Sequence, residues 1–423
     1  MTHNNKIIGR LAFAYLAVGA LAGCGGVTLS YVLHLIQHIA FGYSLDAVLG
    51  HTSFLEGVRQ SSLVRRTCAV VLGGLVAGVG WWWIRNRMAP MVSINQAMKM
   101  PSTGMPVCTT LAHTLLQVIT VALGSPLGRE VAPREVGALS GSLFGRWLHF
   151  SERERQLLLA CGAGAGLAAV YNVPLAGALF TLEGMLMSFE WAMIIPALGT
   201  ASLAAFIASL GLGHTPQYHI IDLPSPALLW VWAVLAGPII GVVAYGFSRA
   251  TAYLQAHAPR DICLPVYCLL TFTTLAGLAC VYPELLGNGK PIVQECLDGH
   301  LVPHTLIALL IFKSLVVLAS LKSGANGGVL TPALALGALC GGLLGEGWTQ
   351  MIDPSLPLGI YALIGAPAFL GTSMKMPLTA VVLFMELTRF DHAFLAPVII
   401  AVMGALCAQR LIVQALAQRE VPV

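Results

Sequence analysis

Charged side chains are scarce in this sequence. Aspartate, glutamate, lysine and arginine together make up 9% of the 423 residues, whereas hydrophobic residues make up 57% and the mean hydropathy is +0.81. Because a soluble domain carries about 25% charged residues, this composition predicts a polytopic membrane protein that lies in a lipid bilayer. The net charge of +4 is small and dispersed, so nucleic acid is not an expected partner.

Catalytic and metal-binding patterns are also missing. The ten cysteines are scattered singly, without the CxxC or Cys/His spacing of a metal site, and neither HExxH nor GxSxG occurs. We therefore expect a protein that is not an enzyme and that needs no metal or cofactor. Glycine and proline, by contrast, are plentiful: 45 glycines and 23 prolines are too many for plain spanning helices, and they predict closely packed, broken helices.

One turn, Gly124 to Gly137, places four ionisable residues between two apolar segments: Arg129, Glu130, Arg134 and Glu135. An ionisable group inside a membrane is costly and usually marks a transport pathway. Pro133 suits the first turn of a helix, which would leave the backbone N–H groups of residues 129 to 132 free to face an anion. The turn therefore predicts an anion site with a carboxylate, Glu130, that competes for it.

The second half of the chain repeats the first. Gly137-Ala-Leu-Ser-Gly-Ser-Leu-Phe-Gly145 recurs as Gly337-Ala-Leu-Cys-Gly-Gly-Leu-Leu-Gly345, and Pro174 with Glu183 recurs as Pro377 with Glu386. Two matches at an offset of about 200 residues indicate paired broken segments around a binding site near the middle of the membrane. The expected organisation is an N-terminal tail (1–6), a first membrane repeat (7–212), a linker (213–224), a second membrane repeat (225–418) and a C-terminal tail (419–423).

Three motifs resemble those of the CLC chloride channel and transporter family. Gly128-Arg-Glu130 is similar to the element that carries that family's gating glutamate, and Gly327-Gly-Val-Leu-Thr-Pro332 is similar to its second anion loop. Asn172-Val-Pro-Leu-Ala-Gly177 and the segment from Pro377 to Glu386 match its paired interface helices. The resemblance implies an all-α fold of two inverted-topology repeats with broken helices. It also implies a multi-pass homodimer with one pore per subunit in the bacterial inner membrane.

The departures from the family pattern carry a finer prediction. Met91 stands where most chloride-handling members place a serine, Gly184 stands where proton-coupled exchangers place an internal glutamate, and no tyrosine follows Tyr361. This combination resembles the bacterial fluoride-transporting branch. It implies an antiporter that exports fluoride in exchange for protons. The alternative is a chloride channel or chloride/proton exchanger of the same fold.

The expected site follows from these motifs. Glu130 is the gating, proton-exchanging carboxylate, which occupies the anion site when charged and leaves it when protonated; otherwise it is only a carboxylate stabilised by a helix N-terminus. The expected anion-binding residues are Met91, Gly128, Arg129, Val131, Ala132, Gly328, Val329, Leu330 and Thr331. Met91 could instead be core filler, and Thr331 an ordinary helix N-cap.

The other ionisable residues in apolar segments are expected to have structural roles. Glu183 and Glu386 are expected to pair with backbone donors or a nearby arginine, with a proton path through Glu183 as the alternative. Lys313, Lys322 and Lys375 are expected at helix ends, reaching towards the membrane interface. His113 is expected to be a buried histidine with its hydrogen bonds satisfied.

Overall fold

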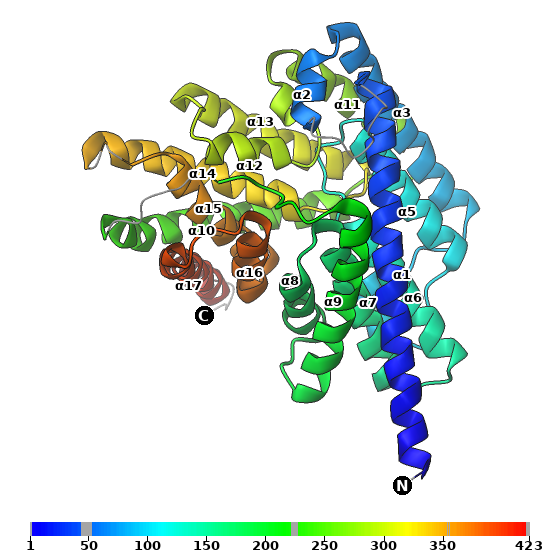
Figure 1. Ribbon diagram of the computed structural model, residues 1–423. Helices are drawn as coiled ribbons and strands as arrows, with labels where there is room; N and C mark the ends of the chain where they lie inside the picture. The colour runs from blue at the N-terminus through cyan, green and yellow to red at the C-terminus, as the bar shows by residue number, and fades with distance from the viewer. Residues whose placement is uncertain (1, 44–52, 221–226, 353, 355, 420–423) are drawn as a thin grey trace.

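The computed structural model describes residues 2–43, 53–220, 227–352, 354 and 356–419, and the segments within them are helices joined by short connections. Figure 1 shows their arrangement. The helices of the first half are α1 (Thr2–Phe41), α2 (Phe54–Gln60), α3 (Leu63–Arg87), α4 (Ile94–Lys99), α5 (Val107–Ala122), α6 (Val131–Trp147), α7 (Glu152–Tyr171), α8 (Pro174–Leu179), the π-helical η1 (Phe180–Leu186) and α9 (Trp191–Leu212).

The helices of the second half are α10 (Leu228–Ala256), α11 (Leu264–Val281), η2 (Pro283–Leu285), α12 (Lys290–Leu297), α13 (Pro303–Ser323), α14 (Leu330–Met351), α15 (Gly359–Met374), α16 (Pro377–Thr388), η3 (His392–Phe394) and α17 (Leu395–Arg419). Within the described residues, eight helices are long and apolar enough to cross a membrane. The all-α polytopic prediction is confirmed.

The ends of the two halves differ from the predicted boundaries. Helix α1 begins at Thr2, so residues 2–6 of the predicted tail are helical and continue into the first repeat. Residues 213–220 of the predicted linker contain no helix, and residues 221–224 lie outside the described residues. Helix α17 ends at Arg419, one residue beyond the predicted repeat.

Large apolar side chains cover the outer faces of the helices. Trp191, Phe206 and Leu210 of α9 are 77%, 61% and 72% exposed. Side chains of this size would be unfavourable against water, so these faces are suited to lipid or to another protein surface.

The repeated glycine motif forms the same helix crossing in each half. A Cβ atom added at Gly137 of α6 would lie 2.0 Å from the carbonyl oxygen of Gly162 in α7, and one added at Gly337 of α14 would lie 2.6 Å from that of Gly365 in α15. The backbones of each helix pair therefore touch, which only glycine permits. The sequence repeat is thus a packing motif.

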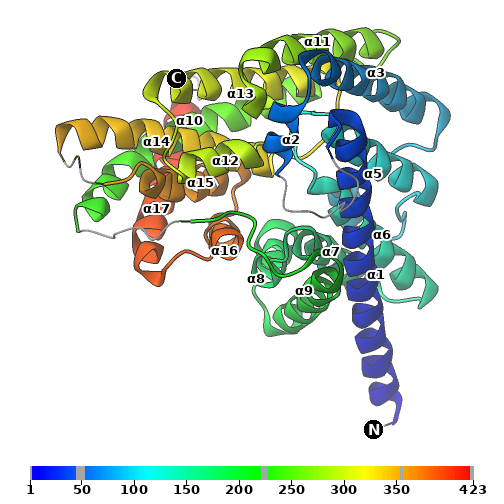
Figure 2. The same ribbon diagram turned by 45° about the horizontal axis from the view of Figure 1, so that its top comes forward.

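Contacts between the halves are reciprocal. Gly128 and Gly328 form an isolated antiparallel bridge, with N–H to O distances of 2.6 and 2.9 Å. Helices α8 and α16 lie side by side between the halves in both ribbon views (Figures 1 and 2). Because equivalent residues meet one another, the two repeats are related by an approximate two-fold axis.

Lys313 does not lie at a helix end as predicted. It projects from within α13, its side chain is fully buried, and its Nζ donates to the carbonyl oxygens of Leu285, at 3.0 Å, and Gly287, at 2.7 Å. These carbonyls belong to the turn before α12, where no helix N–H groups are available to them. The buried Lys313 ammonium group is thus satisfied by backbone carbonyl oxygens. The same two hydrogen bonds hold the turn in place.

We predict that Gly137→Ala destabilises the protein, because the new methyl group would meet the Gly162 backbone and force the two helices apart. The expected loss is about 1–3 kcal/mol, measured as a lower melting temperature in detergent. Gly246 of α10 is the matched control, since a Cβ atom there has no neighbour within 4 Å. Equal melting of Gly137→Ala and Gly246→Ala would contradict the assigned crossing.

Candidate anion site

The bridge between Gly128 and Gly328 places two helix starts at the centre of the molecule. Helix α6 begins at Val131 and helix α14 at Leu330, each two or three residues beyond the bridge. The first N–H groups of a helix have no partner within the helix and carry a partial positive charge. This junction is therefore a favourable place for negative charge inside an otherwise apolar protein.

The Glu130 carboxylate lies on the helix start of the other repeat. Glu130 is fully buried, and it makes no side-chain cap on its own helix α6. Its Oε1 accepts a hydrogen bond from the N–H of Leu330 at 2.9 Å, and its Oε2 lies 3.4 Å from the hydroxyl oxygen of Thr331. The side chain of one repeat thus occupies the N-terminus of α14 in the other, in the manner of a bound anion.

Two glycines make room for this carboxylate. A Cβ atom at Gly128 would lie 2.1 Å from Oε2 of Glu130, and one at Gly328 would lie 2.0 Å from Oε1. Any other residue at either position would collide with the carboxylate. The carboxylate therefore lies in a slot whose walls are the two bridged backbones.

Tyr171 belongs to the site and was not predicted. It ends α7, and its hydroxyl lies 2.8 Å from the Thr331 hydroxyl and 3.4 Å from Oε2 of Glu130. The Arg129 guanidinium lies 5.7 Å from the centre of the Tyr171 ring, within reach of a cation–π interaction. The sequence signal for it is a tyrosine directly before Asn172-Val-Pro.

Part of the predicted anion-binding set comes together and part does not. Gly128, Gly328, Leu330 and Thr331 surround the carboxylate, as described. Arg129 lies beside it on Tyr171, whereas Val131 and Ala132 open α6 and Val329 precedes α14. Anion binding by these residues stays a prediction.

Met91 is not among the residues found around the carboxylate. It precedes α4, whose own start is closed by a capping box: Ser93 Oγ accepts from the N–H of Gln96 at 3.3 Å, and the Gln96 side chain accepts from the N–H of Ser93 at 2.9 Å. The helix start next to Met91 is thus already closed by the side chains of Ser93 and Gln96, and anion binding by Met91 stays a prediction.

Glu183 and Glu386 cap each other's repeats. Both oxygens of Glu183 accept from the start of α16, from the N–H of Leu378 at 3.0 Å and that of Thr379 at 2.7 Å. The oxygens of Glu386 accept from the N–H of Leu175 at 3.1 Å and that of Ala176 at 2.8 Å in α8. Since both carboxylates are fully engaged, the geometry favours the predicted partnering with backbone donors.

Gly184, next to Glu183, is closely packed. A Cβ atom there would lie 2.5 Å from the Sδ atom of Met376. The place where the resemblance expects an internal glutamate is therefore taken by a methionine side chain that precedes α16. A proton path through Glu183 stays a prediction.

The predicted buried histidine has an acidic partner. His113 Nδ1 lies 2.8 Å from Glu135 Oε2, Gln117 donates to the same oxygen at 3.2 Å, and Trp81 packs on the imidazole with ring centres 4.7 Å apart. Glu135 thus points away from Glu130 and towards α5. Within the part of the chain that the structure describes, no group of three or more His, Cys, Asp or Glu side chains is placed to hold a metal ion.

An all-helical membrane protein with one buried carboxylate held by a helix start, at the junction of two repeats, has the architecture of a small-anion transporter. Residues 73–410 match the sequence profile of the family described as Voltage gated chloride channel. The chain therefore belongs to that family, and it is an anion transport protein rather than an enzyme.

Two curated relatives cover nearly the whole chain. A putative chloride channel protein ClcB-like of Ralstonia nicotianae is 28% identical over 91% of this chain and 91% of its own length. The H(+)/Cl(-) exchange transporter ClcA of Vibrio campbellii is 28% identical over 95% of this chain and 86% of its own length.

Two solved structures have the same fold. A slow cyanobacterial Cl-/H+ antiporter matches with a TM-score of 0.81 at 19% identity, over 95% of each chain. A CLC-type fluoride/proton antiporter matches with a TM-score of 0.68 at 18% identity, again over 95% of each chain. These matches confirm the predicted CLC fold.

We predict that Glu183→Gln and Glu386→Gln lower stability by a similar amount, about 1–3 kcal/mol each, because both remove a charged acceptor from two helix N–H groups. The ratio of protons to anions transported should be unchanged in both. The measurements are melting temperature in detergent and paired anion and proton fluxes in liposomes. Loss of proton movement in Glu183→Gln alone would assign a proton path to Glu183.

Proposed function

We propose that this protein exchanges chloride for protons across a bacterial membrane, with the Glu130 carboxylate as the exchanging group. The observation that carries the proposal is the position of this carboxylate on the N-terminus of α14. A carboxylate and a small anion need the same partners there, the N–H of Leu330 and the hydroxyl of Thr331. They therefore exclude one another.

Protonation links the two substrates. A charged Glu130 is attracted to the partial positive charge of the helix start, and a neutral carboxylic acid loses most of this attraction. The protonated side chain can then leave the slot between Gly128 and Gly328, and an anion can enter. When the anion leaves and the carboxylate returns, the proton is released. The charged carboxylate and the anion thus alternate at one place, and each change between them takes up or releases a proton.

Chloride is the anion that the relatives favour. The curated relative from Vibrio campbellii is named as an H(+)/Cl(-) exchange transporter, and the solved structure with a TM-score of 0.81 is a Cl-/H+ antiporter. Fluoride, the anion predicted from the sequence, is the second candidate. It is supported by the absence of a serine at Met91 and by the similar fold of a fluoride/proton antiporter.

We further infer a homodimer in the bacterial cytoplasmic membrane. The two curated relatives come from bacteria. The segments that resemble the family's interface helices lie in α8 and α16, and exposed apolar residues continue from them along α9.

We predict that chloride drives larger fluxes than fluoride in liposomes that contain the purified protein, and that either transported anion moves protons in the opposite direction. Anion efflux is followed with ion-selective electrodes while a dye reports internal pH. Fluoride flux that exceeds chloride flux would reverse the assignment of the anion. Anion flux without proton movement would make the protein a channel.

We predict that Glu130→Gln abolishes proton movement driven by an anion gradient, because the amide is permanently neutral and resembles the protonated acid. Anion flux that remains should be independent of pH. Glu135→Gln is the matched control: it neutralises another buried carboxylate of α6, one that faces His113 and not the site. Proton-coupled exchange that survives in Glu130→Gln would refute the role of Glu130.

A further inference from the structure

We infer that a small monovalent anion binds at a second position, in the cavity that Tyr171 and Thr331 share with Lys290. From this cavity, held there by Lys290, the anion enters the slot that Glu130 leaves. The inference rests on the proposed function, since it supplies the anion to the Glu130 slot. The cavity measures about 10 Å³, and it is lined by three leucines together with Tyr171, Thr331, Gln217, Tyr218, Asn288 and Lys290.

The cavity adjoins the slot directly. Tyr171 and Thr331, which line the cavity, are the two hydroxyl residues that lie 3.4 Å from the Glu130 carboxylate. Lys290, which also lines it, is exposed at the surface. An anion held in the cavity would therefore stand between the surface and the N-terminus of α14, next to the hydroxyl groups that it meets when Glu130 leaves.

The backbone that carries Lys290 is held rigidly. Lys313 binds the carbonyl oxygen of Gly287, and the N–H of Gly287 donates to Gly124 O at 3.2 Å. Gly289 has a φ of 101°, a left-handed conformation that favours glycine, and Asn288 Oδ1 accepts from the N–H of Lys290 at 3.3 Å. Lys290 is thus presented from a fixed turn rather than from a mobile loop.

The segment between the repeats closes the cavity. The N–H groups of Gln217 and Tyr218 both donate to the carbonyl oxygen of Leu387 near the end of α16, at 3.0 and 3.1 Å. Gln217 Oε1 then accepts from Lys290 Nζ at 3.1 Å. In Figure 2 this segment runs from the end of α9 past α16. What the sequence presents as a plain linker is a wall of the cavity and positions its cation.

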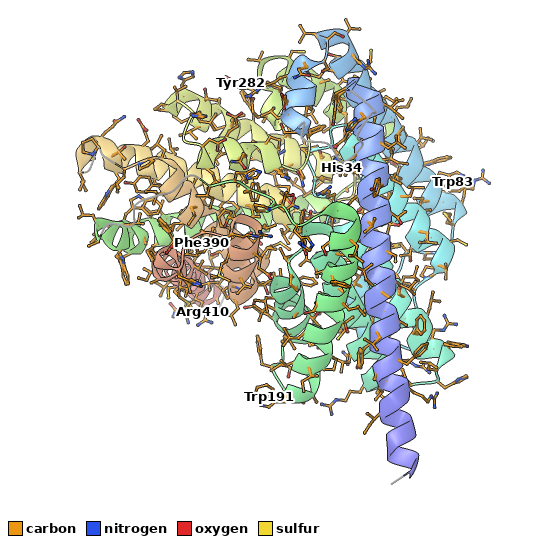
Figure 3. All side chains as sticks on the ribbon, in the orientation of Figure 1. His34, Trp83, Trp191, Tyr282, Phe390 and Arg410 are labelled. Carbon is orange, nitrogen blue, oxygen red and sulfur yellow. The ribbon has the colours of Figure 1, made fainter. Side chains whose placement is uncertain are left out.

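The charge of the region favours an anion. Across the described residues, no ion pair joins Lys290 or Arg129 to a carboxylate, and Lys290 Nζ is instead bonded to a neutral amide. His34 lies towards the C-terminal end of α1 (Figure 3), and its imidazole is near both basic side chains. Arg129 and Lys290, when protonated, outweigh the single Glu130 carboxylate, and an excess of positive charge raises the local concentration of anions.

The size of the cavity limits the ligand. A volume of about 10 Å³ is close to the minimum that holds one water molecule. A single atomic ion without water fits this space with little rearrangement, whereas a polyatomic or organic anion does not. The ligand class is therefore a halide, chloride in the first instance.

The test is the dependence of flux on chloride concentration in Lys290→Met, which keeps most of the length of the side chain and removes its charge. We expect half-saturation to require about tenfold more chloride, while the maximal flux and the proton-to-chloride ratio stay as in the unmodified protein. Lys290→Arg should restore most of the loss. Lys322→Met is the matched control, because Lys322 is an exposed lysine whose Nζ bonds His257 O at 2.7 Å, away from the cavity.

Each outcome of this test has a separate meaning. Should Lys290→Met fail to fold, as judged by size-exclusion chromatography, Lys290→Gln replaces it, since glutamine can still donate to Gln217. Unmodified protein without chloride flux would refute the proposed function itself. Normal proton-coupled chloride flux with the same half-saturation in the lysine variants would overturn only the inference. Reduced maximal flux at unchanged half-saturation would also overturn it, because Lys290 would then act on the exchange step.

Discussion

The pairing of Gly128 with Gly328 is the contact on which the rest of the site depends. Two hydrogen bonds hold the backbones of the two repeats together at one point, and this point fixes where α6 and α14 begin. Because a helix start attracts negative charge, the bridge creates a positive locus inside an apolar protein without any cofactor. It also explains why both positions are glycine: the bridged backbones are the walls of the slot that holds the Glu130 carboxylate.

The same principle recurs at three places between the halves. Glu130 lies on the start of α14, Glu183 on that of α16, and Glu386 on that of α8. In each case a carboxylate from one repeat meets the free N–H groups of the other. The three carboxylates differ in the hydrogen-bond donors that hold them. Glu183 and Glu386 each accept from two backbone N–H groups, whereas Glu130 accepts from one, with hydroxyl groups at longer distances. The more weakly held carboxylate is the one that, in the proposed function, a competing anion displaces.

Much of this arrangement could be predicted from the sequence. Three features are predictable because each is a local sequence pattern with a counterpart in the other repeat: the Glu130 motif, the second loop from Gly327 to Pro332, and the pair of Glu183 and Glu386. Tyr171, Tyr218 and Lys290 were missed as site residues because only the meeting of distant segments brings them to the centre. Lys313 was placed at a helix end, since a sequence does not reveal that the carbonyl oxygens of a turn will surround it. The prediction that Met91 belongs to the anion site rests on spacing in the sequence alone, and spacing does not show that Ser93 caps α4.

The reciprocal capping has a consequence for how the chain is made. The N–H groups of Leu175 and Ala176 find their acceptor, Glu386, only 210 or 211 residues later in the chain. At a synthesis rate of about 5–20 residues per second, the first half would wait about 10–40 s for this partner. During that interval α8 has an open start inside the membrane and Gly128 has no bridge. The newly made first repeat therefore depends on lipid headgroups, water or the insertion machinery until the second repeat arrives, and the ribosome's pace sets the duration of its exposure.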